Sequence, residues 1–492
     1  MSLFSALPCR SASKAARVRL AALMMTATSV WVGLPALAAP GGQAPHIAIQ
    51  VLSGRPDLVS GNTALVAVRA PAAVLARGLV VRAGSRDVST GIRMRPNGLY
   101  EGLVAGLPLG SSEITATYGR ATARLRVNNH PQGGPLFAGP QMTPWVCQEG
   151  AKDRQCNAPK TFNLGYMPVA LKNSGASLGA VEDPSAFRPY DPTDPPPSAS
   201  VATTTTDQGI TVPYIVRTET GFIDRDQYSM TTLYRPGRQW TPWSPQDQWN
   251  HKLLIAHGSS CGIAHTAGTA PSTMIDAALG RGFLVMSTAA DNAGHNCDVV
   301  RQAESLVMAK ELLTKEYGEI RYTIGTGCSG GSLTQQQVAN AYPGIYQGIL
   351  PQCSFPDAWT TLQQVEDDTL LRNYLENPTK WVTGAAWTPT QIAAVEGHPN
   401  HSNAVLLSVL DALIDPAAAC AGVTASQQWS PSNKKGTRCT LQDFAVNIFG
   451  RRPDGYAGRA FDNVGVQYGL AALKGGFISP AQFIDLNQKI GS

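Results

Sequence analysis

The stretch that decides the fold covers residues 320–342 and reads IRYTIGTGCSGGSLTQQQVANAY. Its beginning, residues 320–325, has the pattern of a short strand, and residues 332–342 have the pattern of a helix. Between the two lies a GxSxG sequence, Gly327-Cys328-Ser329-Gly330-Gly331. A GxSxG at a strand-to-helix turn is typical of a nucleophile elbow, whose glycines permit the strained bend that lifts the serine hydroxyl clear of the sheet. We therefore predict that Ser329 is a nucleophile, and a plain glycine-rich turn is the competing interpretation.

Strand and helix patterns alternate on the N-terminal side of this motif. Apolar residues recur at helical spacing between residues 303 and 317, and Gly318 is a stop signal. This alternation predicts a mostly parallel sheet covered by helices on both faces, with its active site at the carboxyl ends of the strands. The expected strands are 214–217, 228–234, 253–256, 283–286, 320–325 and 348–350.

The loop after the expected strand at 253–256 reads His257-Gly258-Ser259-Ser260. In α/β hydrolases the loop at this place supplies one backbone N–H of the oxyanion hole, and the residue after the nucleophile supplies the other. We therefore expect the donors to be Ser259, or Gly258, together with Gly330. Each donor stabilises the charge of the tetrahedral intermediate by roughly 3 kcal/mol. We interpret His257 as a structural histidine that shapes the loop, in preference to a proton-transfer role.

A β-rich segment precedes this α/β pattern. Residues 46–130 contain short β-type runs at about ten-residue spacing, separated by turn signals and without helical periodicity. The pattern predicts an immunoglobulin-like β-sandwich, for which a spacer role is favoured over ligand binding. After a Pro/Gly-rich boundary, residues 136–492 are expected to form an α/β-hydrolase domain, with a cap of helices and loops around 357–445.

The first 38 residues have the pattern of a signal peptide. Basic residues up to Arg19 precede an apolar run at 20–37, and residues 36–38 form a small-x-small cleavage site. A retained membrane anchor is the alternative, because about 18 apolar residues can just span a bilayer. The signal holds four of the 39 basic residues and no acidic residue, which leaves 35 basic against 34 acidic side chains. We expect a secreted or periplasmic protein without attraction to nucleic acid or anionic lipid and without a membrane span after cleavage.

Cysteine usage agrees with export. Beyond the signal, the chain keeps an even number of cysteines, which favours disulfides in an exported protein. A zinc site is disfavoured, because the sequence has neither a CxxC nor a paired histidine spacing. Proximity along the chain suggests the pairs Cys147 with Cys156, Cys261 with Cys297, Cys328 with Cys353, and Cys420 with Cys439.

These motifs resemble those of known proteins. Over nearly the whole mature length, the chain is similar to an uncharacterised family of secreted bacterial proteins with an α/β-hydrolase core behind a small β domain. The residues that carry this resemblance are 207–209, 212–214 and 462–468. A local resemblance to the tannase and feruloyl esterase family rests on 327–331, 342–343 and 346–349. It implies hydrolysis of esters of aromatic acids by a Ser/Asp/His triad, with the cysteine before the serine disulfide-bonded to a cysteine beside the catalytic histidine.

The sequence departs from the tannase pattern after the elbow. Only His398 and His401 follow Ser329, and neither has a neighbouring cysteine. We expect either that this chain stops short of its final strands and catalytic histidine, or that His398 or His401 is recruited from the cap. The triad acid is open as well. Asp357, after the expected strand at 348–350, ranks first, ahead of Asp411 and Asp415.

The sequence thus predicts a secreted serine hydrolase that cleaves carboxylic esters through an acyl-enzyme on Ser329. The ester is aromatic, a polyester oligomer or plant-derived, and the sequence does not choose among these. We expect no metal or organic cofactor and an ester substrate as the partner, and the oligomeric state is not predicted. The alternative is a non-catalytic binding or surface protein on a hydrolase scaffold that lacks a complete triad.

Overall fold

The structure is a computed structural model that describes residues 46–137, 141–173, 186–355, 357–381, 386–415, 417–441, 444–445, 449–453, 456–458 and 466–491. The predicted signal at 1–38 and the start of the motif at 462–468 lie outside these residues. In the described part of the chain, no helix is long and apolar enough to cross a membrane.

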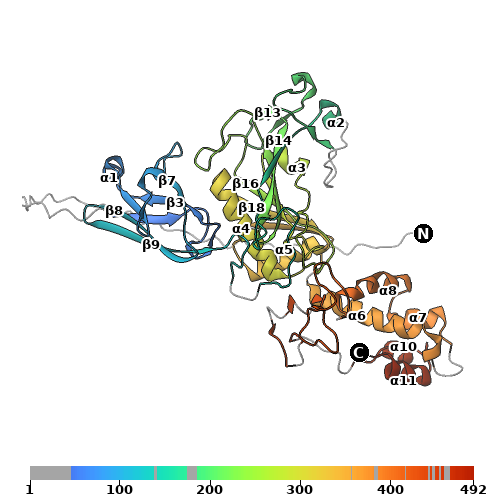
Figure 1. Ribbon diagram of the computed structural model, residues 1–492. Coiled ribbons are helices and arrows are strands. Elements are labelled where there is room, and N and C mark those ends of the chain that lie inside the picture. Colours follow the sequence, from blue (N-terminus) through green and yellow to red (C-terminus); the bar gives the residue numbers. More distant parts are fainter. Residues whose placement is uncertain are drawn as a thin grey trace, which may run out of the picture. The chain divides into compact units, whose positions relative to one another are not determined.

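Two β-sheets form the N-terminal part (Figure 1). The strand order of the first is β1 (Ala48–Val51), β3 (Thr63–Arg69), β7 (Tyr100–Ala105) and β6 (Arg93–Met94). The order of the second is β2 (Val59–Ser60), β9 (Ala121–His130), β8 (Gly110–Tyr118), β4 (Val80–Ala83) and β5 (Arg86–Asp87). Val66 and Val104 of the first sheet share one buried core with Val81, Ile114 and Val127 of the second. The segment is therefore a β-sandwich, with alternating residues buried between the sheets.

One helix in the sandwich was not expected. Helix α1 (Ala72–Arg77) begins after Pro71 and ends at Gly78, whose φ is 84°. A helix of six residues is too short to show helical periodicity, so the residue pattern of this segment did not indicate it.

The main sheet of the second part is mixed. Its strand order is β11 (Arg188–Pro189), β10 (Thr161–Tyr166), β14 (Ile215–Ile223), β15 (Asp226–Leu233), β17 (Leu284–Thr288), β16 (Lys252–Ala256), β18 (Tyr322–Cys328) and β19 (Gly348–Gln352). The pairs from β17 to β19 are parallel, and those from β11 to β17 are antiparallel. The expectation of a mostly parallel sheet holds only for the half that contains Ser329.

The antiparallel half follows from a tight hairpin. Asp224 and Arg225, between β14 and β15, both have positive φ, 48° and 60°. Two consecutive residues of this kind form the turn that joins antiparallel neighbours directly, without a crossover helix. Strands β12 (Thr203–Thr205) and β13 (Thr211–Pro213) pair with each other in a separate small hairpin, which precedes β14 in the chain. Helix α2 (Val169–Asn173) and the 3-10 turn Ser198–Ser200 complete this part, and the 3-10 turns Pro56–Leu58 and Ser89–Gly91 belong to the sandwich.

Both faces of the parallel half are buried. Leu253 and Ile255 of β16 pack with Leu306 and Leu313 of α4 (Val299–Tyr317) in one core cluster, which also includes Val338 of α5 (Gly330–Ala341). On the other face, Leu254 and Ala256 pack with Leu279 of α3 (Asp276–Leu279). Alternate residues of the same strand thus enter two different cores, as in a sheet covered by helices on both faces. This confirms the expected α/β character.

The C-terminal part of the chain is helical. Its elements are α6 (Ala358–Leu375), α7 (Pro389–Glu396), α8 (Ser402–Leu407), α10 (Leu470–Lys474) and α11 (Pro480–Lys489), with 3-10 turns Pro378–Lys380 and Ser408–Leu413. Helix α11 begins at a capping box of Ser479 and Gln482, with Pro480 as its first residue. Helix α10 begins at Leu470, directly after Gly469, which has a left-handed backbone. Tyr374, Trp387 and Leu486 belong to one core shared by these helices.

Candidate active site

Ser329 occupies a strained turn at the carboxyl end of β18. Its φ and ψ are 56° and −117°, and it is the N-cap residue of α5. A non-glycine residue in this region carries backbone strain that the surrounding structure must hold in place. Part of that hold is a hydrogen bond from the Ser329 N–H to the carbonyl of Gln352 in β19, at 3.1 Å. The strand, the turn and the helix thus match the predicted elbow, except that β18 continues to Cys328 and α5 starts at Gly330.

The glycines of the motif are required by close backbone approaches. A Cβ on Gly330 would lie 1.7 Å from the carbonyl oxygen of Ser260, and one on Gly331 would lie 2.1 Å from that of Gly258. A Cβ on Gly327 would lie 2.9 Å from the Cβ of His257. Only glycine permits these approaches. The loop after β16 therefore lies directly against the elbow.

The expected oxyanion donors lie on these two touching segments. Gly330 is the first residue of α5, so its N–H has no acceptor within the helix. Gly258 is half-buried and Ser259 is exposed, and the loop is held by a hydrogen bond from the His257 N–H to the carbonyl of Thr326, at 2.9 Å. Ser260 turns the chain with a φ of 65°. The loop that contains Gly258 and Ser259 thus lies against the turn that contains Gly330.

Two disulfides flank the elbow. Cys328 is bonded to Cys353 just after β19, and Cys261 of the oxyanion loop is bonded to Cys297. Two further bonds join Cys147 to Cys156 and Cys420 to Cys439. These are the four pairs that proximity in the sequence suggested. They also show the departure from the tannase pattern, because the partner of Cys328 has no histidine beside it.

His257 is fully engaged beneath the elbow. Its Nδ1 lies 2.7 Å from Oδ2 of Asp291, and both side chains have no exposed surface. The other ring nitrogen, Nε2, lies 3.1 Å from the hydroxyl of Tyr346. One proton arrangement fits all three groups, in which the Tyr346 O–H donates to Nε2 and Nδ1–H donates to the carboxylate. Burial raises the pKa of Asp291, and the neighbouring His257 opposes this shift. The arrangement accords with a structural role for His257.

A second histidine and aspartate meet at the same edge of the sheet, and the sequence analysis did not find them. His295 Nε2 lies 3.2 Å from Oδ2 of Asp226, and the Gly268 N–H donates to the other carboxylate oxygen at 2.7 Å. Asp226 begins β15, which runs antiparallel to β17, so it lies beside the carboxyl end of β17. The available signal was the group of polar residues within 291–296, which begins five residues after the predicted strand at 283–286.

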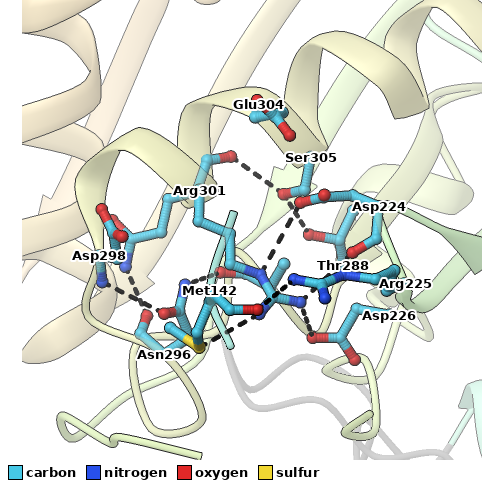
Figure 2. Close-up of polar contacts among 12 residues, drawn as sticks. Met142, Asp224, Arg225, Asp226, Thr288, Asn296, Asp298, Arg301, Glu304 and Ser305 are labelled. Atoms are coloured by element: carbon cyan, nitrogen blue, oxygen red, sulfur yellow. Dashed lines mark hydrogen bonds and ion pairs between the residues drawn. The ribbon is translucent and has the colours of Figure 1, made fainter. Parts of the chain in front are cut away.

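A buried ionic cluster fixes the Asp226 carboxylate (Figure 2). Arg301 of α4 donates to Oδ2 of Asp226 at 3.2 Å and to the carbonyl of Asp224 at 3.3 Å. Its guanidinium stacks over the ring of Trp145, 3.8 Å from the centroid. Burial raises the pKa of Asp224 and, together with the charge of Arg301, lowers the pKa of Arg225 to about 10. The cluster ties the β14–β15 turn to α4.

The histidines expected from the cap have other partners. His401 Nδ1 lies 2.7 Å from Glu396, and its Nε2 lies 3.0 Å from Glu376. His398 is exposed and its Nδ1 lies 2.8 Å from the carbonyl oxygen of Asn400. Asp357 precedes α6, where its carbonyl accepts a hydrogen bond from Thr361. Within the described ranges, no residue forms a hydrogen bond with the Ser329 hydroxyl. No general base is therefore hydrogen-bonded to Ser329 in this part of the chain.

The comparison with protein families places this chain. Residues 49–492 match the tannase-like family of unknown function DUF6351. The chain belongs to this family. Among curated proteins, none matches the sequence.

Three solved fungal structures resemble this member of the tannase-like family. Feruloyl esterase B from Aspergillus oryzae is 16% identical, with a TM-score of 0.24 over 59% of this chain and 60% of its own. An esterase from the same organism is 11% identical, with a TM-score of 0.25 over 68% and 60%. Tannin acyl hydrolase from Aspergillus niger is 12% identical, with a TM-score of 0.24 over 59% and 62%. The chain thus spans about three fifths of the length of each.

Proposed function

We propose that this member of the tannase-like family is a secreted serine hydrolase that cleaves carboxylic esters, with Ser329 as nucleophile. The observation that carries the proposal is the backbone of Ser329, with a φ of 56° between β18 and α5. Glycine would adopt this turn without strain, so packing alone gives no reason for a serine there. A hydroxyl held at a strained turn on the carboxyl edge of parallel strands is the arrangement of a hydrolase nucleophile.

Further features support this function. The strand order supports it, because the parallel strands of the main sheet lead into the turn at Ser329. The proposal includes an α/β-hydrolase domain at 136–492 behind an immunoglobulin-like domain at 46–130. The four disulfides fit an oxidising compartment outside the cytoplasm. Membership of a tannase-like family favours ester substrates, and aromatic, polyester-oligomer and plant-derived esters are all within the proposal.

The proposed reaction begins with attack of the Ser329 hydroxyl on the ester carbonyl. The N–H of Gly330, with that of Ser259 or Gly258, stabilises the oxyanion. When this intermediate collapses, the bond to the alcohol oxygen breaks and the alcohol leaves with the proton taken from Ser329. Water then attacks the acyl-enzyme, and the acyl group leaves as the carboxylic acid while Ser329 regains its proton. A histidine accepts the serine proton. In this sequence His398 and His401 are the candidates after Ser329, with Asp357 as the candidate acid, and His401 has to leave Glu376 or Glu396 to take this role.

Turnover of graded esters tests the proposal. The purified chain is assayed with 4-nitrophenyl esters of increasing acyl size and with a methyl ester of an aromatic acid. Ser329→Ala is expected to abolish release, because the acyl-enzyme cannot form. Ser111→Ala, an exposed serine of β8, is the control and keeps full activity. Equal activity of Ser329→Ala and the unaltered chain would reject Ser329 as nucleophile.

A non-catalytic binding protein is the second candidate. This candidate is favoured because two histidines near the elbow have partners other than Ser329. His257 lies against Asp291 and Tyr346, and His295 is paired with Asp226. A fluorophosphonate probe separates the two candidates, since it reacts only with an activated serine. Absence of labelling at high protein concentration, together with saturable binding of an uncleaved ester, would establish the binding protein.

A further inference from the structure

A cavity of about 710 Å³ lies at the edge of the main sheet away from Ser329. Its walls include Ile320 just before β18, Ile345 just before β19, and one face of α4. Because β18 and β19 are parallel, the residues that precede them lie at the amino edge, whereas Ser329 follows β18 at the carboxyl edge. The cavity is therefore separate from the candidate active site.

The outer wall comes from the β-sandwich and is anchored by buried polar contacts. Leu52 and Leu58 line the cavity from the segment between β1 and β2. Next to them, Ser60 donates to Oε2 of Glu311 from its N–H at 3.0 Å and from its hydroxyl at 2.5 Å. Lys315 donates to the carbonyl of Ser60 at 2.9 Å. These bonds join the sandwich to α4 and hold the wall in place.

Lys310 of α4 is the unusual residue of this cavity. Its ammonium donates to the carbonyl oxygen of Ile345 at 2.5 Å, which uses one of its three donors. Within the described part of the chain, no carboxylate pairs with it, since the adjacent Glu311 is bonded to Ser60 and Lys315. Burial alone lowers the pKa of Lys310 to about 8. A largely buried ammonium without a counterion is unfavourable unless a ligand supplies the negative charge.

The surroundings of Lys310 are largely apolar. Val307 and Ile320 line the cavity, and so do Phe137 and Tyr342, whose rings stack with their centroids 5.2 Å apart. The other charged groups in the lining are Arg55, Glu311, Glu319 and Arg321. Arg55 is paired with Asp57, and Glu319 and Arg321 are exposed. The space next to Lys310 thus offers apolar contacts to one part of a ligand and a half-buried ammonium to its end, whereas the Arg321 guanidinium is exposed to solvent.

We propose that this cavity is a second ligand site, which binds a carboxylate anion with an apolar body. The ammonium of Lys310 pairs with the carboxylate, and the stacked rings of Phe137 and Tyr342 contact the apolar part. A hydrogen-bonded pair of opposite charges in a partly buried site is the strong kind of polar contact. The inference goes beyond the proposed hydrolase and does not depend on it.

Calorimetric titration of the full chain with decanoate tests the proposal. Lys310→Met keeps the apolar stem and removes the charge, and it is expected to weaken decanoate binding roughly tenfold or more. Lys474→Met, an exposed lysine of α10, is the matched control and leaves binding unchanged. Ser329→Ala also leaves it unchanged, because the cavity is separate from the elbow. Unaltered binding by Lys310→Met, or loss of binding in Ser329→Ala, would overturn the proposal.

The unaltered chain gives a second test that does not depend on whether the variant folds. Decanoate is expected to bind roughly tenfold more tightly than decanol at about pH 7, and this preference falls at about pH 9 as Lys310 loses its proton. Of the facing groups, Glu319 and Arg321 are exposed, the hydrogen bond to Asp57 raises the pKa of Arg55, and burial raises the pKa of Glu311 and of Tyr342. Equal affinity for decanoate and decanol, or a preference that is unchanged by pH, would overturn the site.

Discussion

The carbonyl oxygen of Ser260 lies against the α-carbon of Gly330, so closely that a Cβ on Gly330 would fall 1.7 Å from it. The contact joins the loop after β16 to the first turn of α5, the two segments that carry the expected oxyanion donors. Any side chain at 330 has to push these segments apart. The geometry of the proposed site therefore depends on this glycine.

Gly330→Ala is expected to lower ester turnover about 100-fold or more, because displacement of the loop moves at least one oxyanion donor away from the reacting oxygen. Measurement of kcat and KM is expected to show that the loss lies in kcat, with KM little changed. Gly348→Ala is the control, since a Cβ at Gly348 meets no atom within 4 Å. Equal loss in both variants would show that the contact with Ser260 is not what matters.

The strain at Ser329 predicts a difference between two inactive variants. Ser329→Gly and Ser329→Ala both lack the hydroxyl, but glycine adopts a φ of 56° without strain. Ser329→Gly is therefore expected to be about 1 kcal/mol more stable than Ser329→Ala in urea unfolding. The opposite order of stability would mean that the turn relaxes when the hydroxyl is removed.

The buried pair beneath the elbow predicts a graded loss of stability. Asp291→Ala removes the carboxylate that lies 2.7 Å from the buried Nδ1 of His257 and is expected to lower the free energy of unfolding by about 2–3 kcal/mol. Tyr346→Phe removes one neutral hydrogen bond and is expected to lower it by about 1 kcal/mol. Urea titration measures both, with the exposed Asp194→Ala as control. Similar values for all three variants would contradict the arrangement.

His401 predicts a pH dependence in the helical part. Burial lowers its pKa, but the bonds to Glu376 and Glu396 outweigh this effect, so the folded pKa lies above the usual value of 6.5. The stabilisation is thus fully present below about pH 6.5 and is lost as the pH rises through the folded pKa. Amide hydrogen exchange becomes faster with pH in any chain. In residues 389–407 the exchange rate should rise over that pH range by more than this intrinsic amount, and His401→Gln should remove the additional rise. His398→Gln is the control and should keep the additional rise in exchange rate. If His401→Gln also keeps it, the expectation is contradicted.

Local signals in the sequence predicted much of the fold and part of the site. The strand before Ser329, the helix after it and the oxyanion loop are each contiguous in the chain, so their residue patterns are sufficient. The pairing of Cys328 with Cys353 followed from short separation in the same way. Each of these elements is determined by residues that lie within a few tens of positions of one another in the sequence.

The contacts that were missed depend on topology. Asp226 and His295 meet only because β15 runs antiparallel beside β17, which the sequence pattern did not reveal. The cavity at Lys310 needs the sandwich as its outer wall, and no residue near Lys310 in the sequence indicates this. Helix α1 was missed for the different reason that it is too short to show a period.

The most direct measurement of the central claim is the site of a fluorophosphonate adduct in the intact, oxidised chain. Proteolysis and mass spectrometry are expected to place a single adduct on the peptide that contains Ser329, and Ser329→Ala is expected to carry none. An adduct on Ser259 or Ser332, or no adduct on a chain that hydrolyses esters, would contradict the assignment of the nucleophile.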